Sequence, residues 1–296
     1  ADLAADNTTG LLTPHVKLDG ETDGASVALV VTDPEGYAVY EGPAAGDTIE
    51  IEGIQPWSHA APVLYHAVLT LRDADGVLQE VVPYDIGFRR FEMINGVMCL
   101  NGERVVFNGV NRHEWNADRG RAIGADDMHA AMAVFKKNNI NAVRTCHYPD
   151  QSLWYDLCDR NGIYMIDETN LESHGSWQKL GAVEPSWNVP GSLPEWKDCV
   201  VDRARSMFER DKNHAAVLIW SCGNESYAGE DILAMSQFFH DHDPGRLVHY
   251  EGVFHCRAFD AISDMESRMY AKPWEIREYL EYHPKKPFIL CEYMHD

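Results

Sequence analysis

Over roughly the first 92 positions, short apolar runs alternate with polar residues and turn sequences, a pattern that predicts β-strands. An apolar, β-branched run at 27–32 ends in a turn sequence, Asp-Pro-Glu-Gly, at 33–36. Further strands are predicted at 37–40, 48–51, 65–71 and 77–82. This spacing favours a small antiparallel sandwich. Because this half carries no reactive pattern, we interpret it as a packing or binding module.

From about residue 94 the pattern changes to apolar strands that alternate with amphipathic helices. The clearest helix covers 126–138, where Met128, Met132 and Phe135 share one face. Ser192-x-x-Glu195, with a proline between them, predicts a capping box that opens a long helix reaching residue 213. The remaining predicted elements are strands at 105–111, 140–146, 162–166, 217–221, 247–250, near 270 and 288–291, and helices at 153–161 and 273–282.

Apolar strands between helices predict a parallel sheet, which is either an open doubly wound sheet or a barrel. No glycine-rich phosphate-binding loop follows a predicted strand, and this counts against the nucleotide-binding open sheet. We therefore predict an α/β fold, a (β/α)8 TIM-type barrel at 94–296 preceded by a β-sandwich at 1–93. Only about seven strands are recognisable, and 203 residues are fewer than the ~250 of a typical barrel, so we expect an incomplete one.

The residues that follow the predicted barrel strands are unusually polar. A single Glu after a strand is usually a solvated loop residue, but the carboxyl ends of barrel strands all surround one opening. Six polar strand ends therefore predict an active site. They are Asn111 to Glu114, His147 to Pro149, Asp167 to His174, Gly223 to Glu225, Met269 with Tyr270, and Glu292 to His295.

Two of these carboxyl groups suit glycoside hydrolysis, which needs one protonated and one ionised carboxyl beside the same bond. Glu225 and Glu292 follow the fourth and seventh predicted strands and could face each other across the barrel mouth. A separation of ~5 Å would predict a retaining mechanism. Glu172-x-His174 could place two ligands for a divalent cation on one face of an extended segment, and a polar loop without metal is an equal alternative on that spacing.

Composition excludes several classes of partner and compartment. The 47 acidic residues outnumber the 25 Lys and Arg residues, giving a formal charge of −22, which would repel nucleic acid and anionic lipid. The longest apolar run, 215–220, is six residues, far short of the ~18 of a membrane span. Seven cysteines without a C-x-x-C pair indicate buried free thiols, and no signal peptide is visible, so we expect a cytoplasmic protein.

The order of motifs along nearly the whole chain resembles glycoside hydrolase family 2, and within it the long bacterial β-galactosidases. Trp57-Ser58, the Pro-Val-Leu-Tyr at 62–65 and the Gly-Phe-Arg at 87–89 are similar to the immunoglobulin-like domain that precedes the family's barrel. The matching barrel motifs are Asn-Gly-Val-Asn-Arg-His-Glu at 108–114, Asn-Ala-Val-Arg at 141–144, His-Tyr-Pro at 147–149, Trp-Tyr at 154–155, Leu-Cys-Asp at 157–159, Asp-Glu at 167–168, Asn-Leu-Glu at 170–172, His-Gly at 174–175, Trp-Ser-x-Gly-Asn-Glu-Ser at 220–226 and Leu-Cys-Glu-Tyr at 290–293.

The resemblance implies hydrolysis of terminal β-D-galactosides such as lactose by double displacement. Glu225 would be the general acid/base and Glu292 the nucleophile. Glu172 and His174, together with Glu225, would bind Mg²⁺, which would tune the pKa and position of the acid/base.

The resemblance also implies a substrate-binding set around these carboxyls. Asn224 would hold the sugar's 2-hydroxyl, Tyr270 would lie beside the nucleophile, and His113 and His147 would stabilise the oxocarbenium-like transition state. The full predicted set is His113, His147, Asn224, Tyr270 and His295.

The chain departs from the family at both ends. A jelly-roll sugar-binding domain, which contributes to a Na⁺ site, normally precedes the immunoglobulin-like domain, and the family's eighth strand adds further contacts. We therefore expect a piece of a longer, oligomeric enzyme in which Na⁺ binds only at full length, and whether the piece is active alone stays open.

Three alternatives stay open at the level of sequence. The same family could act on a β-glucuronide or β-mannoside. The chain could be a non-catalytic fragment or a subunit that another polypeptide completes. A metal-dependent hydrolase could use His113, His147 and His174 as ligands.

The Trp-rich loop at 176–191 could line the site or pack as a surface loop.

Overall fold

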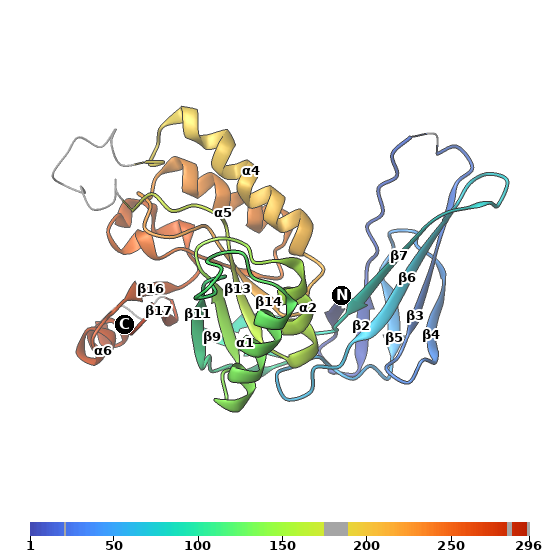
Figure 1. The fold of residues 1–296 in the computed structure, drawn as a ribbon, viewed down its shortest axis with the longest axis horizontal. Helices are drawn as coiled ribbons and strands as arrows, with labels where there is room; N and C mark the ends of the chain where they lie inside the picture. Colours follow the sequence, from blue (N-terminus) through green and yellow to red (C-terminus); the bar gives the residue numbers. More distant parts are fainter. Residues whose placement is uncertain (21, 175–188, 283–285, 295–296) are drawn as a thin grey trace.

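The computed structural model describes residues 1–20, 22–174, 189–282 and 286–294, which form a β-sandwich and a larger α/β domain side by side (Figure 1). The sandwich has a four-stranded sheet, β4-β3-β6-β7, and a three-stranded sheet, β1-β2-β5, with every pair antiparallel. Leu29 and Val31 of one sheet and Leu12 and Ile51 of the other are buried in its core. The strands are β1 (Asp2–Leu3), β2 (Thr9–Leu12), β3 (Ser26–Thr32), β4 (Ala38–Pro43), β5 (Ile49–Glu52), β6 (Tyr65–Arg72) and β7 (Leu78–Ile86).

Five parallel strands form the central sheet of the α/β domain in the order β11-β12-β13-β14-β15, and β16 pairs in parallel with β17. Every residue of β14 is buried because helices and neighbouring strands cover it on both faces. The predicted parallel, barrel-type sheet is confirmed. Its strands are β11 (Gly109–Arg112), β12 (Ala142–Thr145), β13 (Tyr164–Glu168), β14 (Val217–Ser221), β15 (Leu247–His249), β16 (Glu266–Met269) and β17 (Phe288–Glu292).

Helices follow the strands along the chain, as the sequence pattern predicts. Met128, Met132 and Phe135 form the buried face of α1, with acids in its first turn and lysines in its last, which complement the helix dipole. The helices are α1 (Ala125–Lys137), α2 (Ser152–Asn161), α4 (Pro194–Asp211), α5 (Glu230–His242) and α6 (Pro273–Tyr282), with 3-10 turns η2 (Glu251–Phe254) and η3 (Arg257–Ile262).

The predicted capping box at the start of α4 is wrong. The N-cap is Leu193, which makes no side-chain cap, and proline occupies the first turn. The Ser192 hydroxyl instead accepts a hydrogen bond from the backbone N–H of Glu230, which opens α5. The Ser192 hydroxyl thus satisfies a backbone N–H at the start of α5, which packs against α4, and makes no cap on α4.

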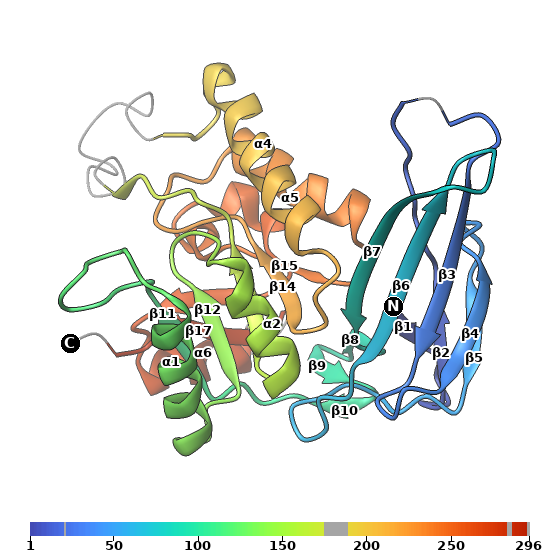
Figure 2. The ribbon, with the colours of Figure 1, turned by 45° about the vertical axis from the view of Figure 1, so that its right-hand side comes forward.

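The two domains are joined by a packed junction. A small antiparallel sheet of β8 (Phe91–Ile94), β9 (Val97–Leu100) and β10 (Glu103–Arg104) follows the sandwich and lies between it and the barrel strands (Figure 2). Trp57 is fully buried within the core of the α/β domain, and its indole N–H donates to the backbone oxygen of Asp159 over 2.8 Å. Arg89 donates to the backbone oxygens of Ala215 and Val217, each over 2.7 Å.

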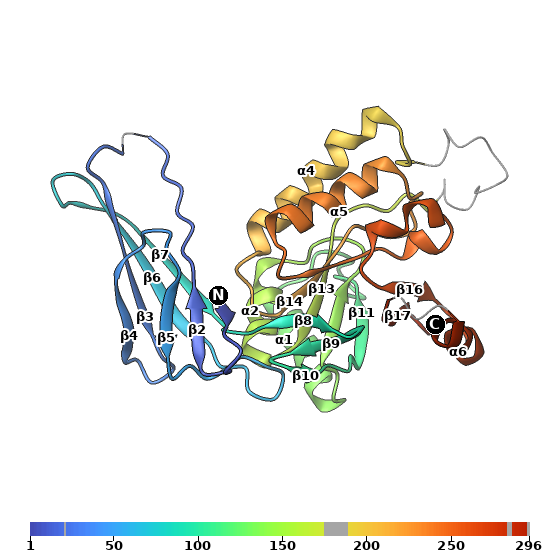
Figure 3. The same ribbon diagram turned by 180° about the vertical axis from the view of Figure 1, so that it is seen from behind.

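A groove of about 900 Å³ separates β11 from β17, and its other walls come from β9, β10, β12, β13 and α6. Figure 3 shows β16, β17 and α6 set apart from the five-stranded sheet. At the mouth of the groove the Asn111 side chain donates to the backbone oxygen of Cys291 over 3.1 Å. The first and seventh predicted strands thus approach each other at their carboxyl ends.

All seven cysteines are free, and five of them are buried. Among the described residues, no helix is long and apolar enough to cross a membrane.

Candidate active site

The carboxyl ends of the parallel strands meet at one edge, and Arg144 of β12 lies at the centre of that edge. Its Nε donates to Oε2 of Glu168 over 2.7 Å, its Nη2 to Oδ1 of Asn224 over 2.7 Å and its Nη1 to Oε1 of Glu292 over 3.1 Å. The side chain is almost fully buried. Burial alone would lower the pKa of Arg144, but the charge of Glu168 and its other partners raises it above the usual value. A permanent cation therefore connects β12, β13, the end of β14 and β17.

Glu292 receives a second donor on its other carboxylate oxygen. The Tyr270 hydroxyl lies 2.5 Å from Oε2 of Glu292, and the Tyr270 backbone N–H donates to the Glu292 backbone oxygen over 2.7 Å. Tyr270 has a φ of 57°, so its backbone is held in the left-handed region by these contacts. Each carboxylate oxygen of Glu292 accordingly has one donor, an arrangement that fixes the orientation of the carboxylate.

Glu225 is held by its backbone in an uncommon conformation, with a φ of 37°. Its N–H donates to Oε1 of Glu251 over 2.6 Å. Gly223 has a φ of 135°, and a Cβ there would lie 2.6 Å from the Leu171 backbone oxygen, so the Gly-Asn-Glu turn requires glycine at this position. The turn thus aims both Asn224 and Glu225 into the opening.

The electrostatic surroundings of Glu225 favour a proton on it. Burial raises the pKa of the Glu225 carboxyl, the negative charges of Glu172 and Glu292 raise it further, and His174 opposes them. Burial also raises the pKa of the neighbouring Glu251, to about 8. Burial thus disfavours the charge of Glu225, whereas both carboxylate oxygens of Glu292 accept a hydrogen bond. This is the asymmetry that acid/base and nucleophile roles need.

Glu172, His174 and Glu225 form a compact group in which the potential ligand atoms lie within 4.8 Å of one another. Glu172 makes a parallel bridge with Asn224, whose side-chain amide donates to Oε2 of Glu172 over 2.6 Å. His174 pairs with Oε2 of Glu225 through Nδ1. Two carboxylates and an imidazole are a donor set that a divalent cation accepts.

His113 and His147 stand at the same opening, with ring centroids 5.5 Å apart and edge-on to each other. Nδ1 of His147 lies 2.8 Å from Oε1 of Glu168. Burial lowers the pKa of His113, and the positive charge of His147 lowers it further, while Glu292 acts in the opposite direction. His147 thus shares Glu168 with Arg144, which in turn contacts Glu292.

The structure brings most of the sequence-predicted site residues together. The exceptions are one residue outside the described part of the chain and the three histidines of the alternative metal site. Asn224, Tyr270, Glu225 and Glu292 surround one opening, and the metal group is beside them. His295 lies outside the described residues, as does most of the Trp-rich loop. The three histidines of the alternative metallohydrolase do not form one group, because His174 belongs with Glu172 and Glu225, whereas His113 and His147 lie near Cys146.

Sequence reasoning gave no role to Arg144 or Glu251 and placed Glu168 at a polar strand end without a specific role; the structure places all three in the site. One signal was present for Arg144. It is an arginine inside a predicted strand of a buried parallel sheet, and a buried charge requires partners. The same holds for Glu168 at the end of β13, whereas Glu251 follows β15 and carries no such pattern.

The chain matches two family descriptions: "Glycosyl hydrolases family 2, TIM barrel domain" over residues 91–296 and "Glycosyl hydrolases family 2" over residues 4–89. It belongs to glycosyl hydrolase family 2. This membership confirms the resemblance drawn from the ordered motifs and the pairing of a sandwich with a barrel.

Its relatives in family 2 include proteins named β-galactosidase. The chain is 55% identical over 302 residues to the β-galactosidase of Halalkalibacterium halodurans, covering 100% of this chain and 30% of the relative. It is 52% identical over 295 residues to the β-galactosidase large subunit of Lactobacillus acidophilus, covering 97% of this chain and 47% of the relative. The chain thus spans about a third to a half of the length of these relatives.

The fold is also that of solved family 2 structures. The β-glucuronidase of Ruminococcus gnavus superimposes with a TM-score of 0.82 at 22% identity, covering 98% of this chain and 52% of that one. The β-glucuronidase of Dictyoglomus thermophilum gives a TM-score of 0.76 at 20% identity, over 98% and 54%. At these identities the likeness concerns the fold.

Proposed function

We propose that this chain carries the catalytic carboxyls of a retaining β-galactosidase that hydrolyses terminal, non-reducing β-D-galactosides such as lactose. The observation that carries the proposal is the pair Glu225 and Glu292, which Arg144 connects by contacting both Glu292 and Asn224, the residue before Glu225. High identity to relatives named β-galactosidase favours galactosides over glucuronides and mannosides.

In the first step, a carboxylate oxygen of Glu292 attacks the anomeric carbon while the glycosidic C–O bond breaks and Glu225 protonates the departing oxygen. Arg144 and Tyr270 hold the Glu292 carboxylate oriented before the attack. In the second step, Glu225 removes a proton from water, the water oxygen bonds to the anomeric carbon, and the bond to Glu292 breaks. The sugar leaves with its original anomeric configuration.

The remaining polar groups bind the sugar. Asn224, fixed by Arg144 on its amide oxygen and by Glu172 on its amide nitrogen, is placed to contact the 2-hydroxyl. His113 and His147 contact other hydroxyls, where hydrogen bonds that strengthen in the transition state lower the barrier.

Mg²⁺ is proposed as the cofactor, held by Glu172, His174 and Glu225, whose ligand atoms already converge. When bound, it supplies positive charge beside the acid/base, which lowers the pKa of Glu225. We propose that Na⁺ binds only in a full-length enzyme, through segments outside this chain.

The cell compartment and assembly are proposed on separate grounds. Seven free cysteines, five of them buried, fit a reducing cytoplasm. Relatives from Lactobacillus acidophilus and Leuconostoc lactis are named large subunits, so we propose that the protein works in an assembly with further polypeptide.

Hydrolysis of nitrophenyl β-galactoside, β-glucuronide and β-mannoside tests the proposal, with Glu292→Gln as the disabled variant and the exposed Glu80→Gln as the matched control. We expect hydrolysis of the galactoside alone, abolished in Glu292→Gln and unchanged in Glu80→Gln. NMR should detect the β-anomer as the first product, and an α-anomer would contradict retention. A folded sample that hydrolyses none of the three would favour the alternative of a subunit that needs completion.

A further inference from the structure

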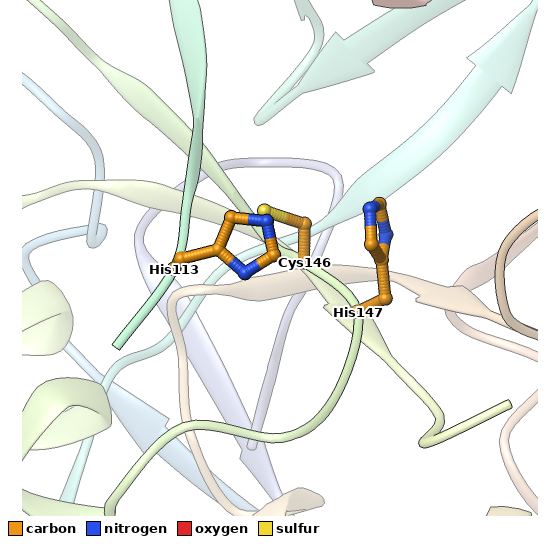
Figure 4. A group of neighbouring side chains, drawn as sticks. All are labelled: His113, Cys146 and His147. Atoms are coloured by element: carbon orange, nitrogen blue, oxygen red, sulfur yellow. The ribbon is translucent and has the colours of Figure 1, made fainter. Parts of the chain in front are cut away.

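His113, Cys146 and His147 form a second group of potential metal ligands, separate from Glu172, His174 and Glu225. Their ligand atoms all lie within 4.8 Å of one another. Figure 4 shows the Cys146 sulfur turned toward the His113 ring, with the His147 ring on its other side.

The strand register explains why the three side chains meet. Arg112 of β11 pairs with Thr145 of β12, so the next residues, His113 and Cys146, leave neighbouring parallel strands at the same level. The Cys146 N–H continues the ladder by donating to the Arg112 backbone oxygen over 3.2 Å. The group is therefore built on the rigid edge of the sheet, which suits a site that needs fixed ligand positions.

The contacts around the imidazoles are those that orient metal-binding histidines. Glu168 accepts from Nδ1 of His147 at 2.8 Å, which leaves the Nε2 lone pair available. The Tyr148 hydroxyl lies 3.2 Å from Nδ1 of His113. A carboxylate or hydroxyl on the far ring nitrogen fixes the tautomer and increases the basicity of the ligating nitrogen.

The donor set selects a soft or borderline ion. Two imidazoles and a thiolate suit Zn²⁺, whereas Mg²⁺ prefers oxygen. Three protein ligands with an open fourth position are an ordinary zinc arrangement, and His113 is exposed, so an ion can enter. Burial raises the pKa of the Cys146 thiol to about 12, so the thiol is protonated until an ion displaces the proton.

We propose that His113, Cys146 and His147 bind Zn²⁺ and that the bound ion excludes sugar from the opening. The exclusion rests on the proposed function, because it takes His113 and His147 as sugar contacts; the metal site itself does not. Binding converts Zn²⁺ and the Cys146 thiol into a Zn–S bond and one released proton, so affinity rises with pH.

Co²⁺ serves as the spectroscopic probe, because a thiolate ligand gives a sulfur-to-cobalt absorption band in the near ultraviolet. The purified, metal-free protein is titrated beside Cys146→Ser, with the exposed Cys199→Ser as the matched control and Glu172→Gln to report on the other metal group. We expect the band in the unaltered protein, in Cys199→Ser and in Glu172→Gln, and its loss in Cys146→Ser. Zn²⁺ should displace the Co²⁺, and its affinity by calorimetry should fall about 10-fold or more in Cys146→Ser.

Absence of the band in the unaltered protein, or its persistence in Cys146→Ser, would overturn the metal site whatever the activity. The exclusion is tested separately: Zn²⁺ should raise KM for a β-galactoside in the unaltered protein and not in Cys146→Ser, and equal inhibition of both would overturn it. A protein that shows the band but hydrolyses no galactoside would favour a subunit that needs completion and would leave the zinc site standing.

Discussion

Arg144 and Glu292 are joined by a hydrogen bond from Nη1 to Oε1 over 3.1 Å, although 148 residues separate them in the sequence. The same guanidinium holds Glu168 and Asn224. One side chain thus sets the position of the proposed nucleophile relative to Asn224, the residue proposed to contact the sugar.

Arg144→Lys should lower kcat for a β-galactoside by about 100-fold or more, because a lysine ammonium cannot reproduce three contacts made by a planar fork. Steady-state hydrolysis measures the effect, and circular dichroism verifies that the variant is folded. Arg160→Lys, at an exposed ion pair with Asp85, is the control. Near-normal kcat in folded Arg144→Lys would show that Glu292 needs no such support.

Tyr270→Phe removes the hydroxyl that donates to Oε2 of Glu292 while keeping the ring. We expect kcat to fall by about 100- to 1,000-fold, the range for losing one preorganised donor at a reacting group. Tyr282→Phe, on an exposed ring of α6, should have no effect. If both variants behave alike, the Tyr270 hydroxyl plays no part in the reaction.

Glu251 accepts the backbone N–H of Glu225 and, with a pKa of about 8, is largely protonated at neutral pH. Glu251→Gln keeps the accepting oxygen and should retain most of kcat. Glu251→Ala should lose about 10-fold or more, because the turn at Glu225 would relax from its positive φ. Comparing the two rates separates positioning from charge, and an equal loss in both variants would indicate that the carboxyl itself is needed.

His240 and Asp264 connect α5 to the segment after β15, with Nε2 and Oδ2 3.0 Å apart. The hydrogen bond to Asp264 raises the pKa of His240 above its ordinary 6.5, so the pair stabilises the fold fully below pH 6.5 and less as pH rises through the folded-state pKa. His240→Gln should therefore lower the free energy of unfolding by about 0.2–1 kcal/mol at pH 6, with the loss shrinking at pH 8.5. Urea titrations at both pH values measure it, and a larger loss at pH 8.5 would contradict the assignment.

Periodicity predicted the barrel strands and most helices because one face of each element must be buried. The match is close for β14 and α6, whose predicted and observed bounds agree. Helix α5 was not predicted, although Ile232, Met235 and Phe239 repeat at helical spacing and are buried. Capping at Ser192 failed because the hydroxyl serves a helix that begins 38 residues later.

The site was predictable in its residue types and not in its connections. Polar strand ends identified the groups that gather at the opening, because parallel strands bring their carboxyl ends together. The partners of Arg144 lie 24, 80 and 148 residues away, and the register and curvature of the sheet determine which of them meet. Local patterns carry no information about distances of that kind.

Trp57 belongs to the sandwich in sequence and to the α/β domain in packing, since its indole is enclosed by that domain's core and lies edge-on to Tyr164. A barrel produced by cutting the chain between 87 and 94 would therefore contain a cavity the size of an indole. Losing a buried tryptophan costs about 3–5 kcal/mol, a large part of the stability of an ordinary domain. We therefore expect the two domains, although separate in fold, to unfold in one cooperative transition and to lose stability when either is removed.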